Sequence, residues 1–264
     1  MQEIVSVIML AYNHENWIAR AIEGVLNQKT DFQFRLYIND DCSTDNTRTI
    51  IQKFKDRNPE KVTLILQSEN QWSKGKHVIS DILIPKTMGK YIAICEGDDY
   101  WIDEYKLQKQ YDYMRRNPKC SIIFSNAKVI DFDGNELTTF LPQDVWNNIN
   151  IKNKILSKEA NFNVEEMILL DFIPTASIMT KRTAYEKMQP LKNELDLMIR
   201  LVATSLGYAH YCNECMVAYR TGNPNSASGV IKKSKQKLKE NFLDLHHNIL
   251  NEFDDFSDNR YSFM

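Results

Sequence analysis

The sequence predicts an α/β domain with a mainly parallel sheet flanked by helices, followed by a C-terminal amphipathic helix. Three observations support this prediction. Short apolar segments alternate with amphipathic helical segments, the connections between them are short, and polar or acidic residues gather directly after the apolar segments. In sheets of this kind ligands bind beyond the carboxyl ends of the strands. We therefore look for functional residues where the predicted strands end.

The length and composition fit one large domain, or a domain with a small appendage. The chain has 264 residues, of which 43% are hydrophobic and 26% are charged. Its net charge of −2 gives no reason to expect nucleic acid binding. The longest apolar runs fall far short of the ~20 residues of a membrane span. An odd number of cysteines, and a strand pattern too near the start for a signal peptide, favour the cytoplasm.

The elements of the first part of the chain alternate regularly. Strands are expected at 4–10, 34–38, 62–66 and 91–95. The first helix is predicted by apolar residues on one face: Ile18, Ala21, Ile22, Val25 and Leu26. A second helix is expected up to about Phe54, with Ser43 or Asp45 as its N-cap. A third is expected over 78–88, although Pro85 is unfavourable there.

After residue 103 the pattern becomes less regular. We expect helices at 103–117, 182–188 and 194–206, and strands at 121–132, 173–180 and 215–220. Asp133-Gly134 predicts a hairpin turn. Residues 138–165 are polar, rich in Asn and without a clear period, which predicts a mobile loop. An apolar stripe over 238–256 predicts the final helix.

The sequence contains no glycine-rich loop for phosphate. None of its 8 glycines forms the Gly-x-Gly-x-x-Gly pattern of dinucleotide-binding proteins. The pair Gly75-Lys76 has Asn70 where a nucleotide-binding P-loop needs its first glycine. A bound nucleotide must therefore be held by other groups.

Three polar or acidic clusters follow the first, second and fourth predicted strands: Tyr12-Asn13, Asp40-Asp41 and Glu96-Gly97-Asp98-Asp99. Right-handed crossovers place all three at one edge of the sheet. So many carboxylates at one edge favour a bound cation that neutralises them. Oxygen ligands of this kind suit Mg²⁺ or Mn²⁺, whose remaining positions phosphate oxygens fill. Each cluster alone is equally typical of a solvated turn or a helix cap, so the prediction rests on their combination.

The same three segments resemble glycosyltransferase family 2. The resemblance rests on VSVIMLAYN at 5–13, DDCSTDNT at 40–47 and YIAICEGDDYW at 91–101, and it covers roughly residues 4 to 222. It implies the Rossmann-like GT-A fold and the inverting transfer of a single sugar from a nucleoside diphosphate sugar, with UDP as the expected nucleotide. It also implies a divalent metal, Mg²⁺ or Mn²⁺, and a role in cell-surface polysaccharide synthesis.

The resemblance assigns the donor-binding residues. Ala11, Tyr12 and Asn13 would border the nucleotide, with Tyr12 near the base. In the pair Asp40-Asp41, the second carboxylate would read the base. These five residues are the expected nucleotide contacts of the first two clusters.

The resemblance also assigns metal and phosphate contacts. Glu96, Asp98 and Asp99 would hold the metal, and Asp98 would also approach the diphosphate. Glu96 stands where the family usually has Asp. Arg220 is a candidate for phosphate contact, and Lys74, Lys76 and His77 in the polar loop are the others. A solvated basic loop is an equally good interpretation of those three.

The catalytic base implied by the resemblance is Asp196, on the helix expected at 194–206 and ahead of the pair Tyr219-Arg220. Asp196 would accept the proton of the acceptor hydroxyl. Glu194 is its rival. The family often has His two residues after the Arg, where this chain has Gly222.

On this basis we divide the chain into a nucleotide-sugar-binding half (1–102), an acceptor-binding and catalytic half (103–228) and a C-terminal helical extension (229–264). The expected partners are a nucleotide-sugar donor and a glycan or lipid-linked hydroxyl acceptor, with no nucleic acid. Lysines at 232–239 form a solvated face by default, and peripheral attraction to the inner face of an anionic membrane is the secondary hypothesis. The apolar stripe that follows favours a core or homodimer face.

Two alternatives from other classes remain open. The first is a catalytically idle nucleotide-sugar-binding protein, which Glu96 and the missing His favour. The second is a metal-dependent nucleotidyltransferase or phosphatase. The second is weakened because no Asp-x-Asp-Gly-Thr motif is present.

The spacing of Cys212 and Cys215 favours buried cysteines over a zinc site. Trp101 fits either sugar stacking or the core.

Overall fold

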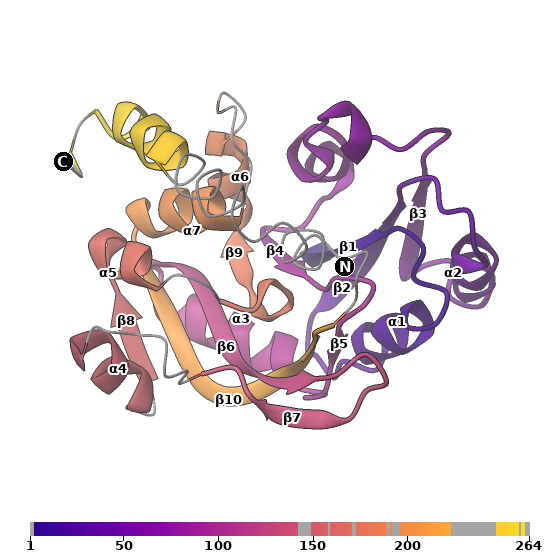
Figure 1. The fold of residues 1–264 in the computed structure, drawn as a ribbon, viewed down its shortest axis with the longest axis horizontal. Coiled ribbons are helices and arrows are strands. Elements are labelled where there is room, and N and C mark those ends of the chain that lie inside the picture. The colour runs from indigo at the N-terminus through magenta and orange to yellow at the C-terminus, as the bar shows by residue number, and fades with distance from the viewer. Residues whose placement is uncertain are drawn as a thin grey trace.

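In the residues that the computed structural model describes, ten strands form one sheet with helices on its flanks (Figure 1). These residues are 3–141, 149–157, 159–170, 173–188, 191, 196–222, 247–258 and 260–261. The strand order is β3-β2-β1-β4-β9-β6-β10-β5, with β7 beside β6 and β8 beside β10. The chain has the α/β architecture that the sequence predicts.

The strands are β1 (Glu3–Ala11), β2 (Gln33–Asp40), β3 (Val62–Leu66), β4 (Tyr91–Ile94), β5 (Tyr100–Trp101), β6 (Cys120–Ile130), β7 (Glu136–Thr139), β8 (Glu159–Phe162), β9 (Met179–Lys181) and β10 (Tyr208–Arg220). The helices are α1 (Ile18–Leu26), α2 (Thr47–Arg57), α3 (Lys106–Arg116), α4 (Ile149–Leu156), α5 (Val164–Leu169), α6 (Arg182–Met188) and α7 (Asp196–Ser205). Shorter helical turns are η1 (Trp72–Lys74), η2 (Val78–Leu83), η3 (Ile84–Lys86) and η4 (Thr175–Ser177).

The first four strands along the sheet form a parallel unit around β1. Strand β1 pairs with β2 on one side and with β4 on the other, and β2 pairs with β3. Val7 of β1 lies between Leu36 of β2 and Ala93 of β4, and all three side chains are fully buried. Helix α1 buries the face predicted for it, through Ile18, Ala21, Ile22 and Val25. Apolar runs and one helical stripe therefore produce this half as expected.

Two helices of this half differ from the prediction at their ends. Helix α2 begins at Thr47, and its N-cap position, Asn46, makes no side-chain cap bond. Instead Asp45 accepts the amides of Thr47 (2.9 Å) and Glu15 (3.0 Å), which ties the helix start to the segment after β1. The helix expected over 78–88 is the π-helical turn η2 followed by the 3₁₀ turn η3, in whose first turn Pro85 lies.

The second half of the sheet is mixed. Among the described strands, four pairs are parallel and five are antiparallel. Three of the parallel pairs lie within β3-β2-β1-β4, and the fourth joins β6 and β10. The short strand β9 runs antiparallel to both β4 and β6 and joins the two halves. Strand β10 is longer than predicted, because its pairing with β6 continues through register shifts at Cys212, Cys215 and Val217. These irregularities accompany the curl of β6 and β10 in Figure 1.

The mobile loop predicted over 138–165 is wrong for the described part of that segment. Helix α4 buries Ile151 and Ile155, and β8 pairs with β10. Helix α5 begins with a capping box in which Asn163 and Glu166 bond to each other's backbone amides. The Asn-x-x-Glu spacing is the sequence signal that identifies this helix start.

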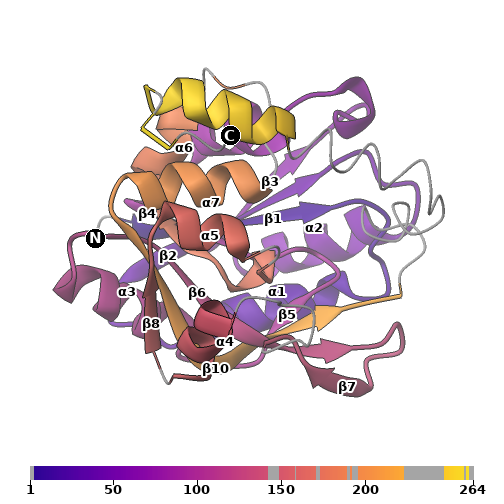
Figure 2. The same cartoon turned by 60° about the vertical axis from the view of Figure 1, so that its left-hand side comes forward.

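Residues 247–256 form a helix beside α6 and α7 in both views (Figures 1 and 2). Ile249 and Phe253 on this helix are buried in the core. The lysines at 232–239 and the first part of the apolar stripe lie outside the described residues. None of the helices described here has the length and apolar character needed to cross a membrane. The five cysteines carry free thiols, and Cys212 and Cys215 are half-buried.

Candidate active site

The carboxyl ends of β1, β2 and β4 bring the three predicted clusters to one edge of the sheet. Strand β1 lies between the other two, and Ala11 at its end is in register with Asp40 at the end of β2. The amide of Gly97 donates to the carbonyl of Leu10 (3.0 Å), so the segment after β4 also runs beside the end of β1. The common edge predicted from the sequence is confirmed.

The segment after β1 is fastened to the loop after β2. Ala11 is buried, and its carbonyl accepts the amide of Asp41 (2.9 Å). Asn13 has a left-handed backbone (φ 55°), a conformation that asparagine adopts more readily than most residues. Its side-chain oxygen accepts the amide of Thr44 (2.8 Å). Tyr12, between these two fixed residues, is 46% exposed, so its side chain is accessible to a ligand.

Asp40 is fully buried and joins β2 to α2. Its Oδ2 atom accepts from the guanidinium of Arg48 and from the amide of Ser43 (3.2 Å). The same guanidinium donates to the carbonyl of Gln67 after β3. Oδ1 of Asp40 has no hydrogen-bond partner among the described residues. The charge of Asp40 is thus paired by a cation of the protein itself.

Asp41 orders the loop after β3. Its carboxylate accepts the amides of Gln71 (2.7 Å) and Trp72 (3.0 Å), at the start of η1. A carboxylate has about four lone-pair positions, so about two positions on Asp41 remain for further donors. Lys76 is exposed in the same loop. The structure therefore joins Asp41, at the end of β2, to the loop that carries Lys76.

We call the segment at 96–99 the acidic loop. Its glycine is packed tightly, because a Cβ added to Gly97 would lie 2.6 Å from Nδ1 of His14 and 2.8 Å from Cδ1 of Ile18. Nε2 of His14 lies 4.0 Å from Oδ2 of Asp98. Burial lowers the pKa of His14, which favours the neutral imidazole. Gly97 thus lets the acidic loop approach α1, with an imidazole beside Asp98.

Arg220 holds the acidic loop from β10. Its amide donates to Oδ1 of Asp99 (2.8 Å), and its Nε donates to the carbonyl of Asp98 (2.9 Å). Asp99 is buried, and its Oδ2 has no hydrogen-bond partner among the described residues. The proposed phosphate contact, Arg220, therefore lies against two of the three carboxylate residues of the expected metal site, Asp98 and Asp99.

The carboxyls of the acidic loop lie in buried, like-charged surroundings. Burial raises the pKa of Glu96 well above its usual range, and the carboxylates of Asp99, Asp196 and Asp98 raise it further. Burial and the charge of Asp98 likewise raise the pKa of Asp99, against the opposing effect of Arg220. A cation at this position would relieve the repulsion that causes both shifts.

Asp196 is the first residue of α7. Its carboxylate is close enough to raise the pKa of Glu96, although the two residues are far apart in sequence. The hydroxyl of Thr175 donates to Oδ2 of Asp196 (2.7 Å) and fixes that oxygen. Glu194, the rival base, lies outside the described residues. The fold thus brings the predicted catalytic carboxylate to the predicted metal cluster.

The described residues contain no group of three His, Cys, Asp or Glu side chains that converge as a metal site. Two features nevertheless fit a divalent cation at the acidic loop. One oxygen of Asp99 is buried without a hydrogen bond, and the pKa of the Glu96 and Asp99 carboxyls is raised. Mg²⁺ is held by one or two carboxylates, completed by phosphate oxygens and water. The donor set therefore fits a cation that arrives with a diphosphate.

The sequence missed some residues of this region. His14 directly follows the Tyr12-Asn13 cluster, and that position is the only sequence signal for it.

Trp101 belongs to the core, since its indole N–H donates to the carbonyl of Ala176 (2.9 Å) and the ammonium of Lys106 lies 4.2 Å from its ring centroid. Burial lowers the pKa of Lys106 to about 7. The open choice for Trp101 is thus decided in favour of packing.

Comparisons with known proteins place this architecture in a family. The family model described as Glycosyl transferase family 2 matches residues 6–187. The uncharacterized protein Rv1520 of Mycobacterium tuberculosis is 31% identical over 216 residues, and the match covers 81% of this chain but 58% of that protein. The putative teichuronic acid biosynthesis glycosyltransferase TuaG of Bacillus subtilis is 28% identical over 88% of this chain and 85% of its own. WfgD of Escherichia coli, named a UDP-Glc:alpha-D-GlcNAc-diphosphoundecaprenol beta-1,3-glucosyltransferase, is 31% identical over 57% of this chain and 56% of its own.

Solved structures share the fold. TarS of S. aureus (residues 1–349), crystallised with UDP, matches 97% of this chain and 73% of its own with a TM-score of 0.62 and 16% identity. The mannosyltransferase PcManGT of Pyrobaculum calidifontis, crystallised with GDP-Man and Mn²⁺, matches 88% of this chain and 61% of its own with a TM-score of 0.58 and 14% identity. The GT-A fold expected from the sequence is confirmed.

Proposed function

We propose, from the premise that this chain belongs to glycosyl transferase family 2, that it moves one sugar from a nucleoside diphosphate sugar to a hydroxyl acceptor with inversion. We propose UDP as the nucleotide and cell-surface polysaccharide synthesis as the setting. The names of TuaG and WfgD support that setting, and WfgD and the UDP-bound TarS support the nucleotide.

The observation that carries the proposal is the meeting of Asp196 with the acidic loop. Carboxyls in buried, like-charged surroundings, one with an unpartnered buried oxygen, are costly to maintain without a role. An inverting transfer needs a leaving-group site and a base on the opposite side of the anomeric carbon. The acidic loop and Asp196 are proposed to supply these two parts.

Asp196 is the proposed catalytic base. Its carboxylate accepts the proton of the acceptor hydroxyl while that oxygen bonds to the anomeric carbon. The bond from this carbon to the diphosphate breaks in the same displacement, and the departing diphosphate takes the electron pair. Thr175 holds one oxygen of the carboxylate and acts as a positioning residue.

The proposed nucleotide border lies at the ends of β1 and β2. The exposed ring of Tyr12 is available to stack on the base, beside Ala11 and Asn13. Asp41 has lone pairs left to accept from an N–H of the base. Asp40 stabilises this region through its ion pair with Arg48.

Glu96, Asp98 and Asp99 are the proposed holders of a divalent cation, Mg²⁺ or Mn²⁺. When bound, this cation offsets the negative charge that develops on the leaving diphosphate. Arg220 keeps Asp98 and Asp99 in place through two hydrogen bonds and is a candidate, with Lys76, for phosphate contact. The Mn²⁺ complex of PcManGT supports this choice of metal.

We propose that residues 1–102 bind the donor, that 103–228 bind the acceptor and carry the base, and that 229–264 form a helical extension. The acceptor is a glycan or a lipid-linked hydroxyl compound, which the diphosphoundecaprenol acceptor in the name of WfgD supports. With such an acceptor the protein would work in the cytoplasm, at the inner face of the membrane. A homodimer through the C-terminal extension is a further proposal.

A thermal-shift panel of nucleotide sugars, with and without Mn²⁺, tests the donor half of the proposal. A donor at 100 times its Kd adds about 2.7 kcal/mol to the unfolding free energy. We expect a UDP-sugar to give the largest metal-dependent shift. Absence of any metal-dependent shift would contradict the proposal, and a shift without transfer to any acceptor would favour an idle binding protein.

A further inference from the structure

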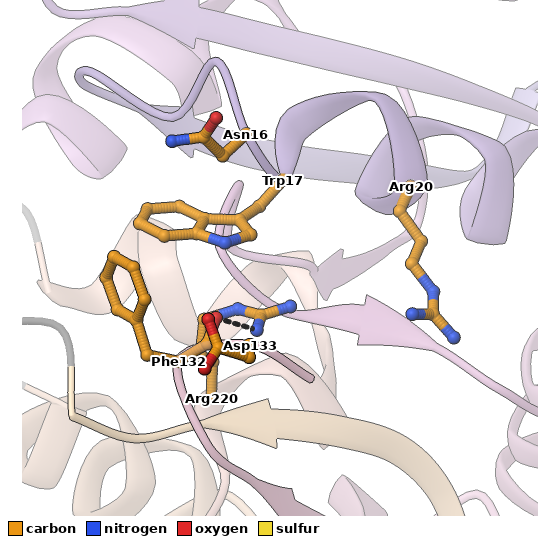
Figure 3. A pocket seen from close by; sticks show the side chains of 6 residues that line it. All are labelled: Asn16, Trp17, Arg20, Phe132, Asp133 and Arg220. Atoms are coloured by element: carbon orange, nitrogen blue, oxygen red, sulfur yellow. Dashed lines mark hydrogen bonds between the residues drawn. The ribbon is translucent and has the colours of Figure 1, made fainter. Parts of the chain in front are cut away.

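A pocket of about 430 Å³ opens between α1, the β6–β7 turn and the end of β10 (Figure 3). Its lining consists of Asn16, Trp17, Arg20, Phe132, Asp133 and Arg220. Only Arg220 among these has been assigned a role. Figure 3 shows the rings of Trp17 and Phe132 around the hollow, with Arg220 below Trp17 and Arg20 hanging from α1 at one side.

Two guanidinium groups border this pocket without a carboxylate partner among the described residues. Arg220 donates through Nη1 to the carbonyls of Asp131 (3.0 Å) and Phe132 (2.8 Å), while its Nη2 makes no hydrogen bond to the described part of the chain. Arg20 is exposed, with its guanidinium carbon 3.7 Å from the ring centroid of Tyr100. Stacking occupies the face of the guanidinium and leaves its N–H edge free to donate.

Both guanidinium groups lie near Gly134 of the β6–β7 turn. A Cβ added to Gly134 would lie 3.9 Å from Nη1 of Arg220 and 4.0 Å from Nη1 of Arg20. Gly134 has a φ of +94°, which favours glycine, and its turn is closed by Asp131 and Asn135. The turn thus lies beside both arginines. Paired guanidinium groups of this kind recognise phosphate.

The pocket also has an apolar wall. Trp17 and Phe132 pack edge to face, with centroids 5.0 Å apart, and Phe132 is 42% exposed. The C–H face of a sugar ring packs well on such aromatic surfaces. Asp133 and Asn16, which complete the lining, offer acceptors and donors for sugar hydroxyls. The pocket therefore combines an anion-binding side with a surface suited to a sugar.

Arg220 connects this pocket to the proposed reaction centre. Its Nε and amide bind the acidic loop, while its Nη atoms face the pocket side. The pocket and the acidic loop therefore share Arg220. Since the donor is assigned to the ends of β1, β2 and β4, a neighbouring sugar site on the side of β6 and β10 fits the second substrate.

We infer that this pocket binds an acceptor sugar that carries a phosphate or diphosphate group, with the anion between Arg20 and Arg220 and the ring against Trp17 and Phe132. The inference rests on the proposed function, because it names the acceptor class of the same enzyme. Such an acceptor presents its free hydroxyl to Asp196 while its anionic group is held at the pocket.

Titration of the metal-free protein with inorganic pyrophosphate, in the presence of a chelator, tests the anion side. We expect binding by calorimetry that weakens about tenfold or more in Arg20→Gln, because one charge-assisted pair is lost. The pyrophosphate affinity of Arg20→Lys should lie between those of the wild type and Arg20→Gln, since lysine keeps the charge but lacks the planar guanidinium. Arg116→Gln, an exposed arginine on α3, makes the same charge change and should have no effect.

The aromatic wall is tested with glucose 1-phosphate against inorganic phosphate. Phe132→Ala should weaken binding of the sugar phosphate severalfold and leave that of phosphate unchanged. Equal effects on both ligands would overturn the sugar-binding part of the inference. Fluorescence of Trp17, identified as the signal that is lost in Trp17→Phe, should change on addition of either ligand.

Three results would overturn the inference as a whole: no pyrophosphate binding, equal weakening by Arg20→Gln and Arg116→Gln, or weakening by Lys76→Gln as large as that by Arg20→Gln. Binding of UDP with Mn²⁺, measured on the same variants, separates the two proposals. Arg20→Gln should leave UDP affinity unchanged, and a parallel loss would assign the pocket to the donor diphosphate. If the wild-type protein fails to bind UDP with Mn²⁺, the donor assignment fails while the pyrophosphate result still stands.

Discussion

At the end of β2, Asp40 is paired with Arg48 and Asp41 accepts two backbone amides. At the end of β4, the acidic loop has three carboxyl side chains. Asp40 and Asp99 each have one buried oxygen without a hydrogen-bond partner among the described residues, but only Asp40 has an ion pair with a cationic side chain there, and the pKa of the Asp99 carboxyl is raised. The two clusters look alike in the sequence, and both follow a buried strand. They differ in the partners that the fold gives them.

This difference separates two uses of acidic residues at a sheet edge. Asp40 is matched by a cation of the protein and stabilises the junction of β2 and α2. Arg220 holds the acidic loop through backbone groups and one carboxylate oxygen. We therefore expect a bound cation to neutralise most of the charge of this loop. We therefore expect the first cluster to govern stability and the second to govern chemistry.

The largest effect is expected at Asp196, the proposed catalytic base. Asp196→Asn keeps the shape and the contact with Thr175 but removes the proton acceptor, so transfer should fall about 10³-fold. Metal-dependent donor binding should remain, which a thermal shift with the same nucleotide sugar would measure. A variant with full transfer activity would show that another group, such as Glu194, is the base.

The next effect concerns stability, and it compares the Asp40-Asp41 cluster with the acidic loop. Asp40→Asn leaves Arg48 without its carboxylate, and we expect a loss of about 2 kcal/mol in the unfolding free energy from urea titration. The value lies below that of a fully buried pair because Arg48 is 36% exposed. The matched change Asp98→Asn should cost less than about 0.5 kcal/mol. Equal losses in the two variants would remove the distinction.

The smallest effect is a pH dependence of the metal-free protein. Because the folded-state pKa of Asp99 is raised, its contribution to stability is complete below the ordinary carboxyl pKa and is lost as pH rises through the folded value. In a chelator, the unfolding free energy should therefore fall on going from about pH 4.5 to pH 7 more in the wild type than in Asp99→Asn. Mn²⁺ should reduce this difference, and a steeper fall in Asp99→Asn would contradict the assignment.

The sequence predicts the elements of the first part of the chain well, because strands such as β1 are continuous apolar runs and α1 has a single apolar stripe. It also predicts which residues meet at the sheet edge, since parallel strands place their carboxyl ends together. It does not predict that Arg48 pairs with Asp40 while no cationic side chain of the described residues forms an ion pair with Asp99, because these outcomes depend on packing between distant segments. The pocket beside Trp17 is missed for the same reason, since its walls come from three separate parts of the chain.

The central claim is that the acidic loop, and not the Asp40-Asp41 cluster, binds the donor diphosphate through a divalent cation. Calorimetric titration of UDP into the wild type, Asp40→Asn and Asp98→Asn, each with and without Mn²⁺, tests it most directly. We predict that Mn²⁺ strengthens UDP binding in the wild type and in folded Asp40→Asn, and that Asp98→Asn loses about tenfold or more of this gain. The same Mn²⁺ dependence in Asp98→Asn as in the wild type would contradict the claim.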